Sequence, residues 1–144
     1  MREQQDLVYR DAPASGAVPP GRPAPANHDW SREVVPTSTL LFRYSALTFN
    51  AHRIHYDRDY AMREEGYPGL VVHGPLVATL LLDLAYVALP GLRVRRFDFR
   101  ATRPLFDSAP FHVCARRAVQ PNRLELWSRD ADGFVTTEAN LDYE

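Results

Sequence analysis

Residues able to transfer protons cluster between positions 48 and 57. This segment reads Thr48-Phe49-Asn50-Ala51-His52-Arg53-Ile54-His55-Tyr56-Asp57. Histidine exchanges protons near neutral pH without a large pKa shift, and an amide five residues before His55 can hold a water or a hydroxyl group beside it. Composition alone favours a plainer role, in which these histidines bond the backbone of a loop. Both roles stay open on this pattern.

Four candidate metal ligands, His52, His55, Asp57 and Asp59, also lie close together in the sequence. Such spacings are common by chance, and no second cluster supplies the remaining ligands of a metal site. We therefore expect no bound metal.

A second informative segment leads into an apolar stretch. It reads Tyr67-Pro68-Gly69-Leu70-Val71-Val72-His73-Gly74-Pro75-Leu76. Proline is a helix start signal, and the first amides of a helix lack partners within it, so they can bind a carbonyl or an oxyanion. Gly74 would let a ligand approach the backbone closely. The simpler interpretation is a capped helix start without a ligand.

The first element that must position these residues is the apolar stretch itself. Residues 75–89 are apolar on nearly every side, with only Thr79 and Asp83 interrupting, and Pro90-Gly91 ends the run. The stretch is too short to cross a bilayer comfortably. It predicts a helix buried in the protein core.

Upstream of this helix, the sequence predicts a shorter one and an irregular segment. The short helix passes through residues 40–46, with Thr37 or Ser38 as its N-cap. Residues 50–69 mix charged and aromatic side chains with turn signals, so we expect an irregular, functional loop there.

Alternating apolar and polar residues predict strands in the second half of the chain. The predicted strands cover residues 92–102, 111–116, 124–127 and 135–143, with a turn at 130–133. One buried helix followed by four antiparallel strands predicts an α+β fold in which a curved sheet wraps around the helix.

The N-terminal quarter has a different character. Residues 1–36 hold six of the twelve prolines, and the proline-rich run from 12 to 25 predicts an extended segment. Short strands are expected at residues 7–10 and near 30–35. We therefore divide the chain into this N-terminal region and a unit at 37–144, which together make one domain.

The overall composition excludes several functions. All seventeen basic residues are arginines, so chemistry that depends on a lysine is absent. A net charge of −1 argues against a general nucleic-acid binder. The chain has no apolar run of membrane-spanning length, no signal peptide at its start and one cysteine, Cys114. We expect a cytoplasmic protein without membrane or nucleic-acid partners.

The order of these features resembles the MaoC-like hydratases of the hot-dog fold. The resemblance rests on the runs Leu41-Phe42-Arg43-Tyr44-Ser45-Ala46-Leu47-Thr48-Phe49-Asn50-Ala51-His52-Arg53-Ile54-His55-Tyr56-Asp57 and Glu65-Gly66-Tyr67-Pro68-Gly69-Leu70-Val71-Val72-His73-Gly74-Pro75-Leu76. It covers about residues 37–144 and is strongest to the branch with 3-hydroxyacyl-thioester dehydratases and mesaconyl- and itaconyl-CoA hydratases. It implies a hot-dog fold.

The resemblance also implies site residues. The broader family has an Asp-x-Asn-x-x-His motif, which places His55 on the catalytic histidine and Asn50 on the aspartate. Because an amide cannot exchange a proton as a carboxylate does, Asn50 would orient water and His55 would be the main acid and base. Gly74 and His73 would hold the thioester carbonyl.

By the same resemblance, Arg53 and Tyr56 would orient the substrate. The implied reaction is reversible addition of water across the α,β double bond of an enoyl thioester of coenzyme A or a carrier protein. The acyl group would be straight-chain, or short and branched or dicarboxylic. No cofactor is implied beyond coenzyme A as part of the substrate. The implied assembly is a homodimer or a larger homo-oligomer.

Two other functions remain open. A hot-dog acyl-CoA thioesterase would act on the same ligands, although no acidic residue lies within the Asn50–His55 core. A non-catalytic subunit that binds acyl thioesters would fit the replacement of aspartate by Asn50. A second substrate carboxylate would need a cation, for which the candidates are Arg43, Arg53, Arg100 and Arg103.

Overall fold

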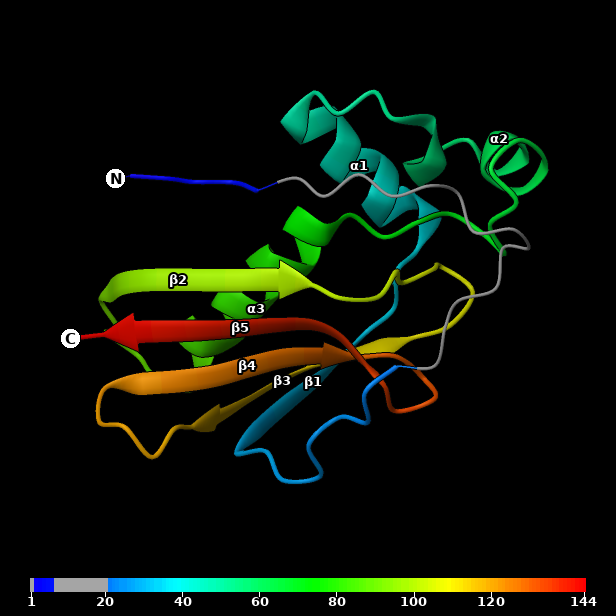
Figure 1. The fold of residues 1–144 in the computed structure, drawn as a ribbon. Helices are drawn as coiled ribbons and strands as arrows, with labels where there is room; N and C mark the ends of the chain where they lie inside the picture. The colour runs from blue at the N-terminus through cyan, green and yellow to red at the C-terminus, as the bar shows by residue number, and fades with distance from the viewer. Residues whose placement is uncertain (1, 7–20) are drawn as a thin grey trace.

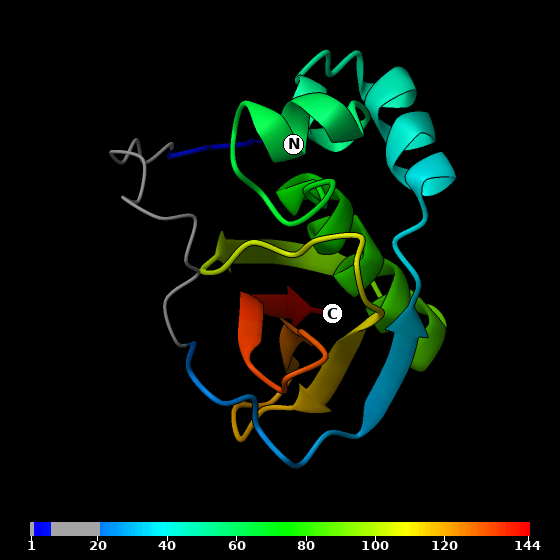
Figure 2. The ribbon, with the colours of Figure 1, turned by 90° about the vertical axis from the view of Figure 1, so that its right-hand side faces the viewer.

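A curved antiparallel sheet and one long helix make up most of the molecule (Figures 1 and 2). The computed structural model describes residues 2–6 and 21–144. In chain order the elements are β1 (Trp30–Val34), α1 (Ser38–Thr48), the 3-10 turn η1 (Arg53–His55), α2 (Arg58–Arg63), α3 (Gly74–Ala88), β2 (Val94–Ala101), β3 (Phe111–Arg117), β4 (Arg123–Arg129) and β5 (Val135–Tyr143). This is the α+β arrangement that the sequence predicts.

The five strands pair in the order β1-β3-β4-β5-β2, and every neighbouring pair is antiparallel. β1 and β2 therefore form the two edges of the sheet. The strands expected near 30–35 and in the second half of the chain are confirmed. β4 runs two residues further than expected, because its pairing with β5 continues to Arg129.

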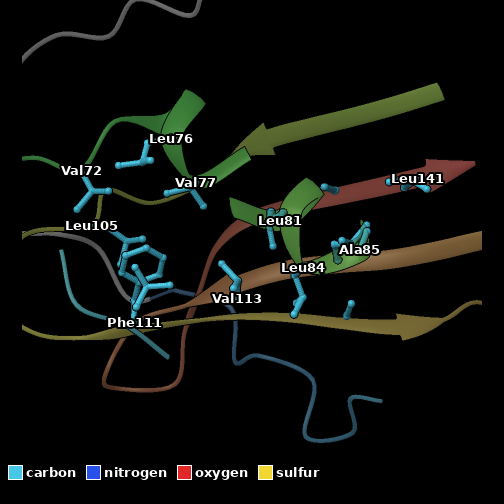
Figure 3. Packing of buried hydrophobic residues seen from close by; sticks show 14 of the residues in the cluster. Val72, Leu76, Val77, Leu81, Leu84, Ala85, Leu105, Phe111, Val113 and Leu141 are labelled. Atoms are coloured by element: carbon cyan, nitrogen blue, oxygen red, sulfur yellow. The ribbon is translucent and has the colours of Figure 1, made fainter. Parts of the chain in front are cut away.

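Helix α3 lies along the concave face of the sheet, and their contact forms the main core (Figure 3). Leu81 is fully buried, and Leu84 and Ala85 lie within the same cluster. The expectation that this helix lies in the core is confirmed for its inner face, whereas its outer face is open, since Tyr86 is 50% exposed and Val87 is 68% exposed. No described segment of the chain covers this outer face.

Helix α1 is longer than the short helix expected from the sequence. Thr37 is its N-cap, and the Thr37 hydroxyl accepts a hydrogen bond from the Leu40 amide at 3.2 Å. The helix ends because Phe49 adopts a left-handed conformation with φ of 53°, and the Asn50 amide turns back to donate to the Ser45 carbonyl at 2.9 Å. The end of α1 thus fixes the backbone position of Asn50.

The segment 50–69, expected to be irregular, contains η1 and α2. The Asp57 carboxylate starts α2 by accepting a hydrogen bond from the Tyr60 amide at 3.1 Å. An N-cap so close behind η1 gives this loop regular structure that the mixed composition did not indicate. Both segments lie with α1 beyond the start of α3 (Figures 1 and 2).

The strand expected at residues 7–10 lies outside the described residues. Further along, residues 22–24 are extended against the start of β5: the Ala24 amide donates to the Gly133 carbonyl at 2.8 Å, and the Val135 amide donates to the Arg22 carbonyl at 2.8 Å. Within the described ranges, no helix has the length and apolar character needed to cross a membrane.

Candidate active site

His55, at the end of η1, is held by a single backbone contact. Its Nδ1 lies 2.7 Å from the carbonyl oxygen of Val71, and the side chain is almost buried. A carbonyl can only accept a hydrogen bond, so Nδ1 carries the proton and donates it. The neutral His55 ring therefore has its lone pair on Nε2, where it can accept a proton from a ligand.

A second histidine lies flat against this ring. The centroids of His55 and His73 are 3.7 Å apart with an interplanar angle of 18°, while His52 meets His55 edge-on at 5.6 Å. The stack joins η1 to the residue that precedes α3. It confines the His55 ring from the side while Val71 fixes it in its own plane.

His73 is itself anchored on α1. Its Nε2 lies 2.8 Å from the hydroxyl oxygen of Ser45, and the Tyr44 ring packs edge-on against it at 4.9 Å. His73 is 1% exposed, and its Nδ1 is buried without a hydrogen-bond partner among the described residues. A charged imidazolium would be poorly stabilised there, because it could not share its second proton.

The pKa of each stacked histidine is lower than usual. Burial lowers the pKa of His73 from 6.5 to about 4, and the nearby His55 adds to this effect. Burial also lowers the pKa of His55; the hydrogen bond to Val71 acts in the opposite direction, and His52 lowers the pKa further. Both rings are thus neutral at pH 7, which leaves His55 ready to act as a base.

Asn50 lies in the turn that leads from α1 into η1. Its Oδ1 accepts a hydrogen bond from the His52 amide at 3.0 Å. In the part of the chain that the structure describes, its Nδ2 has no acceptor. Asn50 therefore shapes the histidine turn with one side-chain atom and can donate to a ligand with the other.

Gly74 is the first residue of α3, and His73 is its N-cap. Among the described residues, the amides of Gly74 and Leu76 have no backbone acceptor, and Pro75 has no N–H. A Cβ on Gly74 would meet only the Cβ of Ala101, at 3.9 Å, which is an ordinary contact. Packing within the chain therefore does not require glycine at this position.

Arg53 and Tyr56, which were expected to orient the substrate, form hydrogen bonds within their own segment of the chain. The Arg53 guanidinium donates to the Asp57 carboxylate at 2.7 and 3.1 Å and lies 4.1 Å from the centroid of the Tyr60 ring. The Tyr56 hydroxyl donates to the Ala51 carbonyl at 2.9 Å. Their contacts stabilise the fold of residues 51–60, and Tyr56 is 41% exposed.

Within the described residues, no three His, Cys, Asp or Glu side chains lie close enough together to hold a metal ion. His52 contacts His55, and His55 stacks on His73.

Sequence reasoning missed two parts of this site. Ser45, which bonds His73, and the Val71 carbonyl, which bonds His55, each act on a residue far away in the chain. Ser45 lies within an ordinary helix and Val71 contributes only its backbone, so neither residue type gave a signal. Only the fold identifies them.

Comparisons with known proteins relate the whole chain to one family of dehydratases and hydratases. The sequence model of the family described as hydroxyacyl-thioester dehydratase type 2 matches residues 1–107. Mesaconyl-C(4)-CoA hydratase from Chloroflexus aurantiacus is 50% identical over 147 residues, covering 99% of this chain and 50% of that protein. The mitochondrial hydroxyacyl-thioester dehydratase type 2 of Schizosaccharomyces pombe is 42% identical over 113 residues, covering 77% of this chain and 35% of that protein.

Solved structures share the fold at low sequence identity. The (R)-hydratase from A. caviae matches with a TM-score of 0.70 and 14% identity, covering 80% of this chain and 92% of that one. HtdX from Mycobacterium tuberculosis matches with a TM-score of 0.66 and 21% identity, covering 97% of this chain and 52% of that one. The chain spans about half the length of the curated relatives it matches. It has the hot-dog fold of the MaoC-like proteins and belongs to the hydroxyacyl-thioester dehydratase type 2 family.

Proposed function

We propose that this protein is a hydro-lyase that adds water to, or removes it from, the α,β double bond of an enoyl thioester. The observation that carries the proposal is the orientation of His55, whose Nδ1 donates to the Val71 carbonyl and whose Nε2 is left as a base. A buried histidine fixed in this tautomer at neutral pH is suited to general acid–base catalysis.

In the hydration direction, His55 Nε2 takes a proton from the water that attacks Cβ. The Asn50 Nδ2 donates to that water and so turns one of its lone pairs toward Cβ. The proton is then delivered to Cα on the same face of the acyl group. In dehydration the imidazolium of His55 returns the proton to the departing hydroxyl.

The thioester carbonyl gains negative charge as Cβ is attacked. In this proposal the Gly74 amide, at the positive end of α3, donates to that oxygen. His73 brings this amide next to His55, because its ring stacks on His55 and its backbone continues into Gly74. In this proposal His73 contributes by position rather than by bonding the substrate itself.

The acyl group is proposed to be short, as in the relative named mesaconyl-C(4)-CoA hydratase. A second carboxylate would need a cation near the site. Arg53 and Arg103 are already paired with Asp57 and Asp130. Arg100 follows Phe97 by three residues on β2, so it points to the face opposite the core. Of the four arginines considered, Arg43 on α1 thus remains as the candidate.

The proposed assembly is a homodimer. The exposed Tyr86 and Val87 on the outer face of α3, and the exposed Phe99 on edge strand β2, are large apolar groups that a second copy could cover. Light scattering after size exclusion tests this proposal. A mass of about twice 16.4 kDa is expected, and a single-chain mass at working concentration would contradict it.

The activity is tested by incubating the protein with crotonyl-CoA, mesaconyl-CoA and longer enoyl-CoAs. Loss of the absorbance of the conjugated thioester without release of thiol is the expected result. His55→Ala should lower the rate at least about 100-fold, the usual scale for a lost general base. His28→Gln, an exposed histidine outside the site, is the matched control and should keep full activity.

Other outcomes would redirect the proposal. Release of free thiol would indicate a thioesterase, and binding of acyl-CoA without any turnover would indicate a non-catalytic subunit. Full activity in His55→Ala would remove the mechanism even if hydration itself is observed.

A further inference from the structure

We propose that Asp107, paired with Arg58, is a positioning residue for His55. This inference rests on the proposed function, because it concerns how the base of that reaction is held. The buried Asp107 carboxylate fixes the loop at residues 69–71, and this loop supplies the Val71 carbonyl that sets the tautomer of His55.

Asp107 binds both backbone polar groups of Leu70. Its Oδ1 accepts a hydrogen bond from the Leu70 amide at 2.9 Å, and its own amide donates to the Leu70 carbonyl at 3.0 Å. The Asp107 side chain is only 3% exposed, so its charge needs a partner. Arg58 supplies it with a two-pronged ion pair, in which Nη1 donates to Oδ1 and Nη2 donates to Oδ2.

The hydrogen bonds between Asp107 and Leu70 also restrain the next residue, Val71, whose carbonyl bonds His55. The next amide, that of Val71, donates to the Ile54 carbonyl at 2.9 Å, and the Val71 carbonyl accepts from His55 at 2.7 Å. The Val72 amide then donates to the Leu105 carbonyl at 2.8 Å. The loop is therefore tied on one side to η1 and on the other to residues 105–107.

Gly69 gives independent support for this tight contact. A Cβ at this position would lie 2.6 Å from Oδ1 of Asp107, which is closer than real Cβ atoms approach. The φ of Gly69 is not in the left-handed region, so backbone conformation does not demand glycine here. The space taken by the Asp107 carboxylate excludes a side chain, as expected if loop and carboxylate are fitted to each other.

If the Asp107–Arg58 ion pair had a purely structural role, its removal would give a different experimental result. Losing it would lower stability but would leave the folded fraction with its normal turnover. A displaced Val71 carbonyl would instead let His55 place its proton on Nε2, which removes the base from that fraction of molecules. The expected signature is a lower kcat, a KM that changes little, and a measurable shift in the His55 tautomer.

The test compares Asp107→Ala, Asp107→Asn and Arg58→Gln with Asp98→Ala. Asp98 belongs to an exposed ion pair with Arg96 on β2 and is the matched control. Turnover of the best enoyl-CoA gives kcat and KM. Long-range ¹H–¹⁵N spectra of histidine-labelled protein, assigned with His55→Gln, give the tautomer of His55.

Asp107→Ala is expected to lower kcat by about 10- to 100-fold, the scale of a small misplacement of a catalytic group. Its His55 nitrogen signals should move toward each other, since both tautomers become populated. Asp107→Asn retains an oxygen for the Leu70 amide and should recover part of the loss. Asp98→Ala should match the wild-type protein in both measurements.

If Asp107→Ala does not fold, Asp107→Asn decides, because it leaves no buried charge without a partner: the remaining Arg58 is half-exposed. A several-fold lower kcat with a shifted His55 signal is expected. Wild-type kcat and an unchanged His55 spectrum in a folded variant would overturn the positioning role. Should the wild-type protein hydrate no enoyl thioester, the proposed function fails, and the nitrogen spectra alone judge whether Asp107 fixes His55.

Discussion

Lowering the pH should reduce the free energy of unfolding of this protein by a predictable amount, because His73 is protonated more easily in the unfolded chain. This side chain is 1% exposed and bonds Ser45 through Nε2, while its Nδ1 has no partner among the described residues. The folded protein therefore resists protonating it, whereas the unfolded chain does not. Lowering the pH from 7 to about 4.5 is the perturbation.

The size of the effect follows from the pKa of His73. Burial lowers this pKa from 6.5 to about 4. The unfolded state binds more protons between these two values, so the contribution is fully present above pH 6.5 and is lost as the pH falls toward 4. At about 1.36 kcal/mol per pH unit, the loss by pH 4.5 amounts to roughly 2–3 kcal/mol.

Urea unfolding at both pH values, followed by tryptophan fluorescence and circular dichroism, measures this loss. Carboxylates also titrate in this range, so the useful quantity is a difference between variants. His73→Gln keeps an amide able to bond Ser45 but cannot titrate, and His28→Gln removes an exposed histidine as the control. Between pH 7 and 4.5, the wild-type protein should lose roughly 2–3 kcal/mol more than His73→Gln.

Equal losses in the wild-type protein and in His73→Gln would refute this reasoning, because they would mean that His73 takes up its proton in the folded state. A large reduction of the loss in His28→Gln would point to a general charge effect instead. Either result would also argue against the neutral state of the stacked His55 and His73, because that state depends on the same burial.

Three further predictions concern the core, the helix start and the base. Leu81→Ala should cost about 2–5 kcal/mol in urea unfolding, because Leu81 is fully buried against the sheet, whereas Leu47→Ala at an 80% exposed position should cost little. Thr37→Ala removes the α1 N-cap and should lower the free energy of unfolding by about 0.5–2 kcal/mol. Because burial lowers the pKa of His55 from its usual 6.5, the midpoint of the acid-side decline in kcat/KM for hydration should lie below pH 6.5, as a pH–rate profile would test.

Local patterns predicted most of the fold correctly. The alternation of apolar residues predicted β3 and β5 nearly to their ends, because each strand has one face on the core. The same reasoning overestimated the burial of α3. Apolar residues such as Tyr86 and Val87 indicate contact with something, but their positions along one helix do not specify whether the covering surface belongs to the same chain.

Only part of the candidate site could be predicted, because the groups that position His55 come from distant parts of the sequence. His55 was proposed as the base from its residue type and from the resemblance, and the structure buries it against His73, the residue before α3. The hydrogen bond from His55 to the Val71 carbonyl spans 16 residues of sequence, and the hydrogen bond from the Leu70 amide to Asp107 spans 37 residues. No spacing rule connects such positions, since their contact depends on how the loops before α3 and after β2 meet.

The strand order has a consequence for how the chain is made. β2 pairs with β5, although β3 and β4 lie between them in the sequence, and β4 needs β5 as its second neighbour. Until residues 135–143 leave the ribosome, β2 has no partner and the apolar face of α3 lacks part of its sheet. Non-local pairing of this kind slows folding and leaves apolar surface and an unpaired strand edge exposed on the nascent chain. We therefore expect a ribosome-bound chain to recruit chaperones until β5 emerges and to stop recruiting them soon afterwards.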